Sequence, residues 1–250
     1  MKNKAFFMLI GVVLTTLSFT LYINIKYPAK KLKKAYCSKD SKGKVTWRGF
    51  NHHNYNYLRK TKKFFVKSLL INEDWGFYDH WGIDVRQLFL AISDTIVDGK
   101  KLRGASTVEQ QLIKNCFFSN ERSYFRKIVE FFLSLELNMI LNKRQILERY
   151  LNTVEFAPKI YSLKKATNYL FSKNPSELDR IESIILVAIF PNPSYYSAQW
   201  LKMIEGTEVK PIMSNRIKRV LSMLRLGKVL DENESELLEL ELMNYEFSLP

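Results

Sequence analysis

Three acidic residues, a histidine and four aromatic residues crowd into residues 73–82. The segment reads Glu-Asp-Trp-Gly-Phe-Tyr-Asp-His-Trp-Gly, so Glu73 and Asp74 lie next to Trp75 and close to Phe77. Aromatic neighbours exclude water from a carboxylate and can raise its pKa toward the range of a general acid or base. A half-buried polar turn packed by the same aromatic residues is an alternative that this segment alone leaves open.

Residues 103–115 lead small side chains into the start of a helix. Ser106 and Glu109 form a capping-box pattern, which predicts a helix that begins there and runs through Lys114. Free backbone N–H groups at such a start favour an anion, and Lys114 follows two turns later. The segment lacks the Gly-Lys-Ser/Thr ending of a nucleotide-binding phosphate loop. A well-capped surface helix is the alternative interpretation.

A third group combines cations with one acid on an apolar helix. Arg126 and Glu130 are four residues apart, beside Arg122 and Lys127, within a predicted helix over 125–141. Such spacing is typical of an ordinary ion pair on a solvated face. Apolar neighbours such as Phe131 and Leu133 leave little of this helix to face water. We therefore expect the charged group to line a cleft.

Composition places these groups in a mainly α-helical protein. The 250 residues are 46% hydrophobic and contain only nine glycines and seven prolines, which favours helices around a sizeable core. A further helix start is expected at Asn142, and residues 176–190 should form a buried helix that Pro191 and Pro193 end. The formal net charge of +14 indicates a polyanionic partner: a nucleic acid, an anionic membrane surface or a phosphorylated substrate.

The two ends of the chain differ sharply in character. Nineteen uncharged residues, Ala5 to Ile23, predict a membrane-spanning helix; a cleaved signal peptide fits less well because no cleavage site follows. Residues 26–50 are basic and polar, as in a linker at a bilayer surface. After Lys228 seven acids and no base follow, either as an amphipathic helix lying on the basic body or as a frayed terminus. Charge around the apolar stretch argues against export of the body.

The two cysteines, Cys37 and Cys116, have neither the spacing of a metal site nor that of a disulfide framework. One disulfide between them is an open alternative, but nothing in the sequence shows their geometry, and we favour unpaired cysteines.

In this order and spacing, the three groups resemble the glycosyltransferase domain of class A penicillin-binding proteins and, given the length, the monofunctional biosynthetic peptidoglycan transglycosylases. The family patterns are E-D-x-x-F-x-x-H-x-G from Glu73, G-x-S-T-x-x-Q-Q-x-x-K-N from Gly104 and R-K-x-x-E from Arg126. I-L-E-x-Y-L-N at residues 146–152 and Pro-Asn-Pro at 191–193 continue the match. The resemblance covers about residues 65–225.

The resemblance implies a mainly α, lysozyme-like helical glycosyltransferase domain with a smaller membrane-proximal lobe, preceded by one transmembrane helix. The expected units are an anchor over 1–25, the basic linker over 26–50, the glycosyltransferase domain over 51–228 and the acidic tail over 229–250. The implied location is the cytoplasmic membrane, crossed once, with the catalytic domain on the outer face.

The implied reaction polymerises lipid II, a lipid pyrophosphate-linked disaccharide pentapeptide, into β-1,4 glycan with inversion at the anomeric carbon. Glu73 is expected to be the general base and Glu130 its partner, holding the cations or binding a divalent ion. No cofactor is required, although a bridging Mg²⁺ or Mn²⁺ stays open. Partners are lipid II, the nascent strand, membrane lipid and other cell-wall proteins. The expected substrate-binding residues are Asp74, Phe77, His80, Gly104, Ser106, Thr107, Gln110, Gln111, Lys114, Asn115, Arg122, Arg126 and Lys127.

Two other functions use the same motifs. A lytic glycosidase also needs a catalytic glutamate on a helical lobe, but the cations from Lys114 to Lys127 suit an anionic leaving group better. A catalytically silent scaffold stays open because residues near Ala157, Ser162 and Leu170 depart from the family pattern. A nucleic-acid partner is disfavoured, because an exported body would not meet one.

Overall fold

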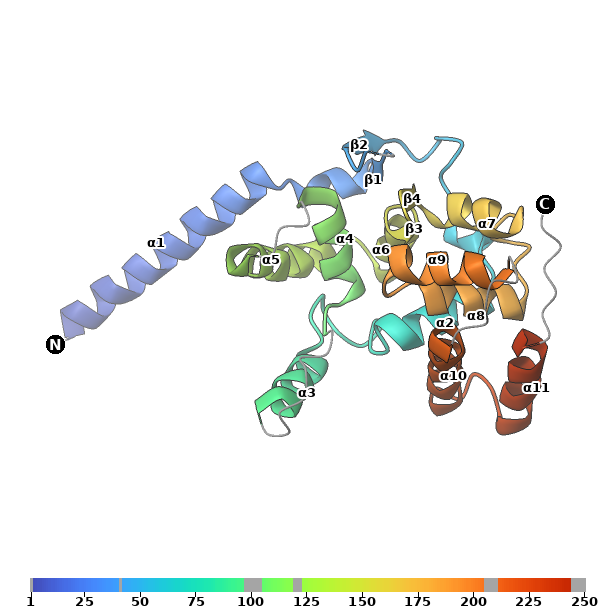
Figure 1. Cartoon of the computed structure of the whole chain (residues 1–250). Coiled ribbons are helices and arrows are strands. Elements are labelled where there is room, and N and C mark those ends of the chain that lie inside the picture. The colour runs from blue at the N-terminus through green and yellow to red at the C-terminus, as the bar shows by residue number, and fades with distance from the viewer. Residues whose placement is uncertain (1, 41, 97–104, 119–122, 205–210, 244–250) are drawn as a thin grey trace.

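The computed structural model describes residues 2–40, 42–96, 105–118, 123–204 and 211–243 of the chain. Helices dominate, with two short hairpins between them (Figure 1). The helices are α1 (Lys2–Lys26), η1 (Ala29–Lys33), η2 (Leu58–Lys60), α2 (Lys63–Glu73), α3 (Val85–Ile96), α4 (Val108–Phe117), α5 (Tyr124–Ile140), α6 (Lys143–Leu151), α7 (Leu163–Phe171), α8 (Arg180–Ile189), α9 (Pro193–Ile204), α10 (Pro211–Leu226) and α11 (Glu232–Met243). The strands are β1 (Tyr36–Lys39), β2 (Val45–Arg48), β3 (Glu155–Ala157) and β4 (Ile160–Tyr161). The expected mainly α fold is confirmed.

Side-chain caps begin several of the helices around the site, although α2, which carries Glu73, has none. Asn142 and Gln145 form a reciprocal capping box at the start of α6, as the sequence predicts. At α4 the capping residue is Thr107 paired with Gln110, one residue later than Ser106 and Glu109. The cap lies one residue later because Glu109 is buried and engaged elsewhere, which leaves Gln110 to bond the cap. Asp179 similarly begins α8 inside the predicted 176–190 segment.

The core centres on α8, whose residues Ile181–Ile189 are all buried. The helix packs against α2 and α10 (Figure 1). Apolar side chains from every part of α8 therefore face protein rather than water, which is why this segment reads as an almost uninterrupted apolar run. This packing places the end of α2 beside α10, an arrangement on which the active site depends.

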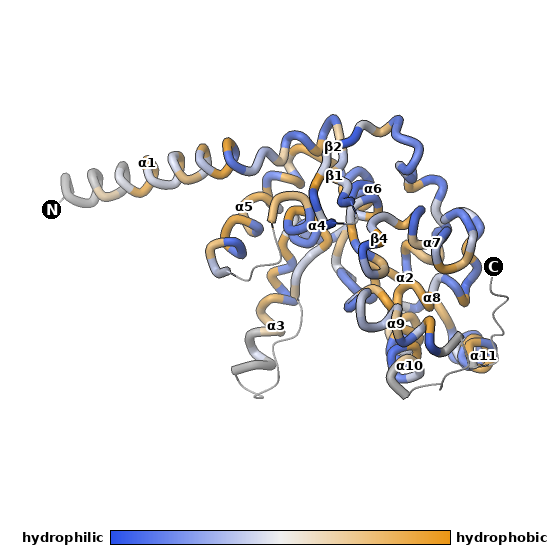
Figure 2. Tube along the Cα trace, turned by 45° about the horizontal axis from the view of Figure 1, so that its top comes forward, coloured by the Kyte–Doolittle hydropathy of each residue, from blue (hydrophilic) through white to orange (hydrophobic). Residues whose placement is uncertain are grey.

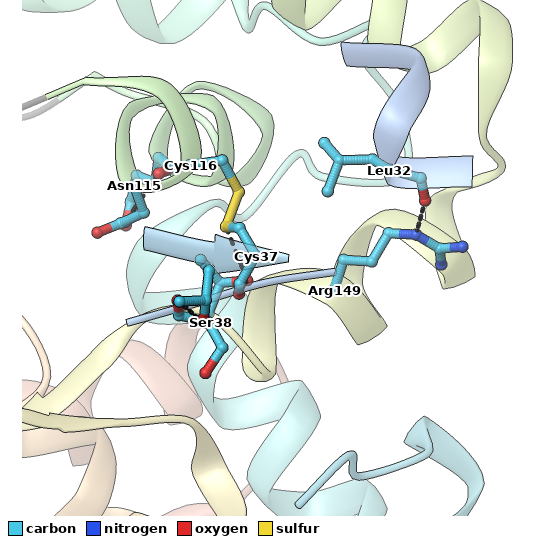
Figure 3. The surroundings of a disulfide bond; sticks show 9 residues. Leu32, Cys37, Ser38, Asn115, Cys116 and Arg149 are labelled. Carbon is cyan, nitrogen blue, oxygen red and sulfur yellow. Dashed lines mark hydrogen bonds between the residues drawn. A yellow bond between two sulfur atoms is a disulfide. The ribbon is translucent and has the colours of Figure 1, made fainter. Parts of the chain in front are cut away.

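The segment expected to be a linker, residues 26–50, is folded onto the body instead. Ala29, Leu32, Tyr36 and Cys37 are buried, and β1 and β2 pair in an antiparallel hairpin. The guanidinium of Arg149 on α6 donates a hydrogen bond to the carbonyl of Leu32 (Figure 3). Apolar residues interspersed among the lysines provide the contacts that hold this segment in place.

Cys37 and Cys116 form a disulfide, so the expectation that they stay unpaired is wrong (Figure 3). Their Cα atoms lie 5.5 Å apart, within the range that the bond requires. The bridge joins β1 to the last turn of α4, one residue after Asn115. The fold of residues 26–50 brings the two cysteines together, and no local sequence pattern could show that.

The N-terminal apolar stretch forms α1, which projects away from the body in both views (Figures 1 and 2). Within the described part of the chain, no helix combines the length and the apolar character needed to cross a membrane. The predicted spanning helix over Ala5–Ile23 is therefore not supported. Ile23 is buried at the foot of α1, and the Phe19 ring packs edge-on against Phe132 of α5 at a centroid distance of 5.6 Å.

The acidic tail forms α11 and lies on the basic body, which confirms the first of the two expectations for it. Leu238 and Leu242 are buried, and Glu234 pairs with Arg180 at 2.9 Å. Lys218 of α10 pairs with Glu239 at 3.1 Å. Opposite charges and an apolar seam together hold this helix against the core.

Candidate active site

Glu73 is the last residue of α2 and is only partly accessible to solvent. Burial raises the pKa of its carboxyl from 4.5 to about 7, while a hydrogen bond from Gln111 and the charge of Arg216 act in the opposite direction. The amide Nε2 of Gln111 lies 3.4 Å from Glu73 Oε2. A carboxylate whose pKa lies near neutral pH can accept a proton and remain partly ionised, as a general base requires.

The loop after Glu73 is held in place by hydrogen bonds to the start of α4. Asp74 is buried, with one oxygen 2.9 Å from His80 Nε2 and the other accepting the backbone N–H of Val108 at 2.8 Å. Thr107 donates its hydroxyl to the carbonyl of Gly82 at 2.7 Å. Both contacts fasten this loop to the start of α4.

Gly82 permits the close approach of this loop to α5. Its φ is +83°, and a Cβ there would lie 2.4 Å from the carbonyl oxygen of Ser134. Any side chain at this position would clash with the backbone and strain the turn. The glycine of the first motif is therefore required by packing.

Helix α4 carries two polar side chains toward Glu73. Gln111 is held from behind by the buried Tyr150, whose hydroxyl donates to Gln111 Oε1 at 2.8 Å and thereby turns Nε2 toward Glu73. Lys114 follows one turn later, and burial lowers the pKa of its ammonium. Glu130 and Glu73 both lie close enough to raise that pKa. Lys114 therefore lies in the electrostatic field of both glutamates.

Helix α5 supplies the cations. Glu130 is fully buried; its two oxygens lie 3.0 Å from Arg126 Nε and 2.7 Å from Lys127 Nζ. Lys127 also donates to the hydroxyl of Ser106 at 3.1 Å, which connects α5 to the segment before α4. Glu130 thus holds two cations in place, and the interpretation as an ordinary solvated ion pair does not apply to a carboxylate with no exposed surface.

The predicted site residues converge from separate elements. Contacts run from Glu73 through Gln111 to Ser106, and from Ser106 through Lys127 to Glu130. A cavity of about 270 Å³ lies beside Glu73 and is lined by Asn72, Asp74, Ser106, Thr107 and Arg219, among others. Lys114 feels the charge of both Glu73 and Glu130, and Arg126 and Lys127 pair with Glu130. These three cations form a cationic surface that belongs to the same network of contacts as Glu73.

Other predicted site residues lie at its edges. Phe77 is fully buried with the Lys143 ammonium 4.6 Å from its ring centroid, and Gln110 bonds the backbone of Thr107. The amide of Asn115 donates to the carbonyl of Gln111 within α4. These groups, like Asp74, His80 and Thr107, make structural contacts that support α4 and the loop after Glu73. Gly104 and Arg122 lie outside the described residues.

Two cations near Glu73, Arg216 and Arg219, were not predicted from the sequence. Arg216 of α10 is half-buried, donates to the carbonyl of Ala188 at 3.2 Å and lowers the pKa of Glu73 through its charge. Arg219, one turn later, lines the cavity beside Glu73. The cluster of basic residues over 216–219 was the available signal, but only the packing of α10 against α2 brings it close to Glu73.

The residues present do not favour a metal ion at Glu130, because both carboxylate oxygens already pair with cations. Among the described residues, Asp74, His80 and Glu109 form the single group whose ligand atoms lie within 4.8 Å of one another. Lys143 Nζ lies 2.6 Å from Glu109 Oε1 and already supplies a positive charge there. Glu130 therefore fits the role of holding the cations better than that of a metal ligand.

Together these groups can remove a proton from a hydroxyl and stabilise a departing anion. A desolvated carboxylate such as Glu73 can act as a base, and cations such as those on α4 and α5 can stabilise negative charge that develops during a reaction. The separation of the two functions onto different helices suits a single displacement with attack on one side and departure on the other.

Known proteins share this pattern. The model of the transglycosylase family matches residues 43–224. A biosynthetic peptidoglycan transglycosylase of Brucella suis is 40% identical over 129 residues, which is 52% of this chain and 57% of that protein. One from Yersinia pseudotuberculosis is 37% identical over 142 residues, 57% and 59% of the two chains. Penicillin-binding protein 1A of Clostridium perfringens is 38% identical over 176 residues, 68% of this chain and 25% of that protein. The chain thus spans less than two-thirds of the length of each of these relatives.

Proposed function

The chain belongs to the transglycosylase family, and on that premise we propose that it is a peptidoglycan glycosyltransferase that polymerises lipid II into β-1,4-linked glycan strands. The observation that carries the proposal is the burial of Glu73, which raises the pKa of its carboxyl to about 7 in the same site as a group of cations. The printed names of the relatives agree with this chemistry.

In the proposed reaction Glu73 accepts the proton of the acceptor 4-hydroxyl. The oxygen attacks the anomeric carbon of the growing strand, the bond to the lipid pyrophosphate breaks, and the configuration inverts. A base near neutral pKa suits this step because it is both deprotonated and basic enough at physiological pH. The donor is already activated, so we propose that no cofactor is required.

The cationic surface is proposed to bind the pyrophosphate leaving group. Arg126 and Lys127 are held by the fully buried Glu130, and Lys114 feels the negative charge of both Glu130 and Glu73. Because the cations are fixed before substrate binds, little reorganisation is needed as charge builds on the pyrophosphate. Glu130 acts as a positioning residue that keeps this surface assembled.

We also propose that the protein works at the outer face of the cytoplasmic membrane, where a lipid-linked substrate would be found. Large apolar side chains are exposed on α1, α3 and α5, including Leu17 at 61%, Phe89 at 71% and Tyr124 at 93%. These three helices lie on the side of the molecule away from α11 (Figure 1). An apolar surface of this kind favours a lipid contact. Protection of the body from protease in intact spheroplasts would contradict this orientation.

The test is incubation of the detergent-solubilised full chain with lipid II, with and without Mg²⁺ or Mn²⁺, followed by separation of the products. The proposal predicts long glycan and release of the lipid pyrophosphate, and Glu73→Gln should remove both. Shortening of isolated sacculi without polymer formation would indicate a lytic glycosidase. Binding of lipid II without turnover by the wild type would indicate a scaffold. If Mg²⁺ or Mn²⁺ stimulates polymerisation and EDTA reverses the stimulation, a divalent ion takes part in the proposed reaction.

A further inference from the structure

A cavity of about 580 Å³ is lined by the loop that follows Glu73, the start of α3 and one face of α5. Its acidic lining residues are Asp79 and Asp84. Within the described ranges neither aspartate forms an ion pair, although the chain as a whole carries a net charge of +14. Two unpaired carboxylates in the lining of one cavity make it a local site for a cation in a basic protein.

The turn at Gly76 brings polar groups of this lining together. A Cβ on Gly76 would lie 2.8 Å from Asp84 Oδ2 and 3.8 Å from His80 Cδ2, so both side chains approach the same glycine. The backbone N–H of Asp79 donates to the carbonyl of Gly76 at 2.8 Å. Asp84 Oδ1 accepts the backbone N–H of Gln87 at 2.9 Å, in the first turn of α3. Asp84 Oδ2 is therefore the oxygen available to a ligand.

His80 adds a further acceptor to the same lining. Its Nε2 lies 2.9 Å from Asp74 Oδ1, and because a carboxylate oxygen only accepts, Nε2 carries the ring proton. Nδ1 is then an acceptor in the neutral ring, and it is buried with no hydrogen-bond partner in the described part of the chain. A primary ammonium has three N–H donors and no acceptor, so it complements a lining of this kind.

Two tryptophans line the cavity together with the aspartates. Trp75 is 48% exposed and Trp81 is 68% exposed, so neither ring is enclosed by the protein. The face of an indole ring attracts a cation that lies within about 6 Å of its centroid. Carboxylates combined with indole rings suit an ammonium group better than they suit an anion or a neutral sugar.

The cavity also borders the apolar surface to which we assign a lipid contact. Phe131 and Leu135 of α5 line it, as does Val85 at the start of α3, which is 70% exposed. Phe89, one turn further along α3, is 71% exposed. Arg86 lines the cavity as well and forms no ion pair among the described residues. A cation site, an arginine and a lipid-facing surface thus occur together.

We propose that this cavity binds the headgroup of an aminophospholipid, with its primary ammonium on Asp79 and Asp84 beside the two tryptophans and its phosphate on Arg86. The proposal rests on the membrane location given under the proposed function, and not on the reaction. The volume lies in the range of small-ligand sites. A headgroup fits because its two opposite charges match the aspartates and the arginine, while its acyl chains would continue onto the apolar surface of α3 and α5.

The proposal predicts a preference among headgroups. Binding of glycerophosphoethanolamine to the detergent-solubilised full chain should be measured by calorimetry beside glycerophosphoglycerol, which keeps the phosphate but lacks the ammonium. We expect the ethanolamine headgroup to bind about tenfold more tightly. Equal binding of the two headgroups, or binding of neither, would overturn the proposal. A pentapeptide with a lysine side chain that binds at least as tightly would also overturn it, in favour of an amine on a substrate peptide.

Matched variants locate the binding. Asp79→Asn/Asp84→Asn should lose most of the preference, and asparagine keeps an oxygen that can cap α3. Glu236→Gln/Glu241→Gln removes two exposed carboxylates of α11 outside the lining and should retain the preference. An equal loss in both double variants would show a general charge effect and contradict the site. Trp81→Ala should also weaken the ethanolamine headgroup. Thermal melting checks that each variant is folded.

The polymerisation assay separates this proposal from the proposed function, because headgroup binding requires no turnover. If the wild type polymerises lipid II but shows no headgroup preference, only the headgroup site fails. If the wild type selects the ethanolamine headgroup, and the aspartate double variant does not, the site stands even where no polymer forms from lipid II. In that case the proposed reaction fails alone.

Discussion

Glu73 and Glu130 are the same residue type in one site, yet their surroundings differ. Glu73 has lost water and gained only a long contact with the Gln111 amide, and its pKa rises to about 7. Glu130 is more deeply buried but has a cation on each oxygen. Burial with no ion pair among the described residues raises the pKa of Glu73 toward that of a base, whereas the buried Glu130 is paired on both oxygens and holds two cations in place. The partners, and not the depth of burial, separate the roles.

The largest effect is expected from Glu73→Gln. The amide retains the shape of the side chain but cannot accept the proton, so polymer formation from lipid II should fall by about 10³-fold or more. Circular dichroism should be unchanged. Polymerisation at the wild-type rate would remove Glu73 from the role of base.

Glu130→Gln should cost about 10²–10³-fold in rate, because Arg126 and Lys127 lose the charge that positions them. The loss should appear mainly in turnover. The matched control for a general packing effect is Lys143→Gln. It disturbs a different ion pair, the one between Lys143 and the buried Glu109. Unchanged turnover in Glu130→Gln would show that the ion pairs of Glu130 with Arg126 and Lys127 are only structural.

The same two substitutions should change stability in opposite directions. Glu73 has a folded pKa above its unfolded value of 4.5, so the folded state is penalised as pH rises from about 4.5 to about 7. Glu73→Gln removes that penalty and should stabilise the protein at pH 8 by up to about 3 kcal/mol, with no gain below about pH 4.5. Glu130→Gln should destabilise it at pH 8, because two cations lose their partner. Denaturant unfolding at pH 5 and 8 measures the free energy of unfolding of both variants. A change of the same sign in both would contradict the contrast between Glu73 and Glu130.

The pH dependence of turnover should show the smallest effect. A base must be ionised, so the rate should rise as pH increases through about 7. Arg216→Gln removes a charge that lowers the pKa of Glu73, so the midpoint should move to higher pH. Lys218→Gln on the same helix, whose charge pairs with Glu239, should leave the midpoint in place. A midpoint that does not respond to Arg216 would place the titration on another group.

Local patterns in the sequence predicted a large part of the site. The Arg126–Glu130 spacing gave the ion pair, because residues four apart on a helix are neighbours whatever surrounds them. The capping box at Asn142 gave the start of α6 for the same reason. Glu73 was identified from its aromatic neighbours and from the motifs that it begins. Each of these inferences needs only a few consecutive residues.

Only the tertiary structure decided which of these groups meet. Arg216 lies near Glu73 because α10 packs against α2 as well as α8, and Cys37 meets Cys116 because residues 26–50 fold back onto α4. Tyr150 holds Gln111 from a helix that the motif alone could not orient. The sequence by itself determined the chemical groups and the helices that carry them. Their convergence, the desolvation of Glu73 and the pairing of Glu130 depend on contacts between distant segments, which periodicity and spacing do not encode.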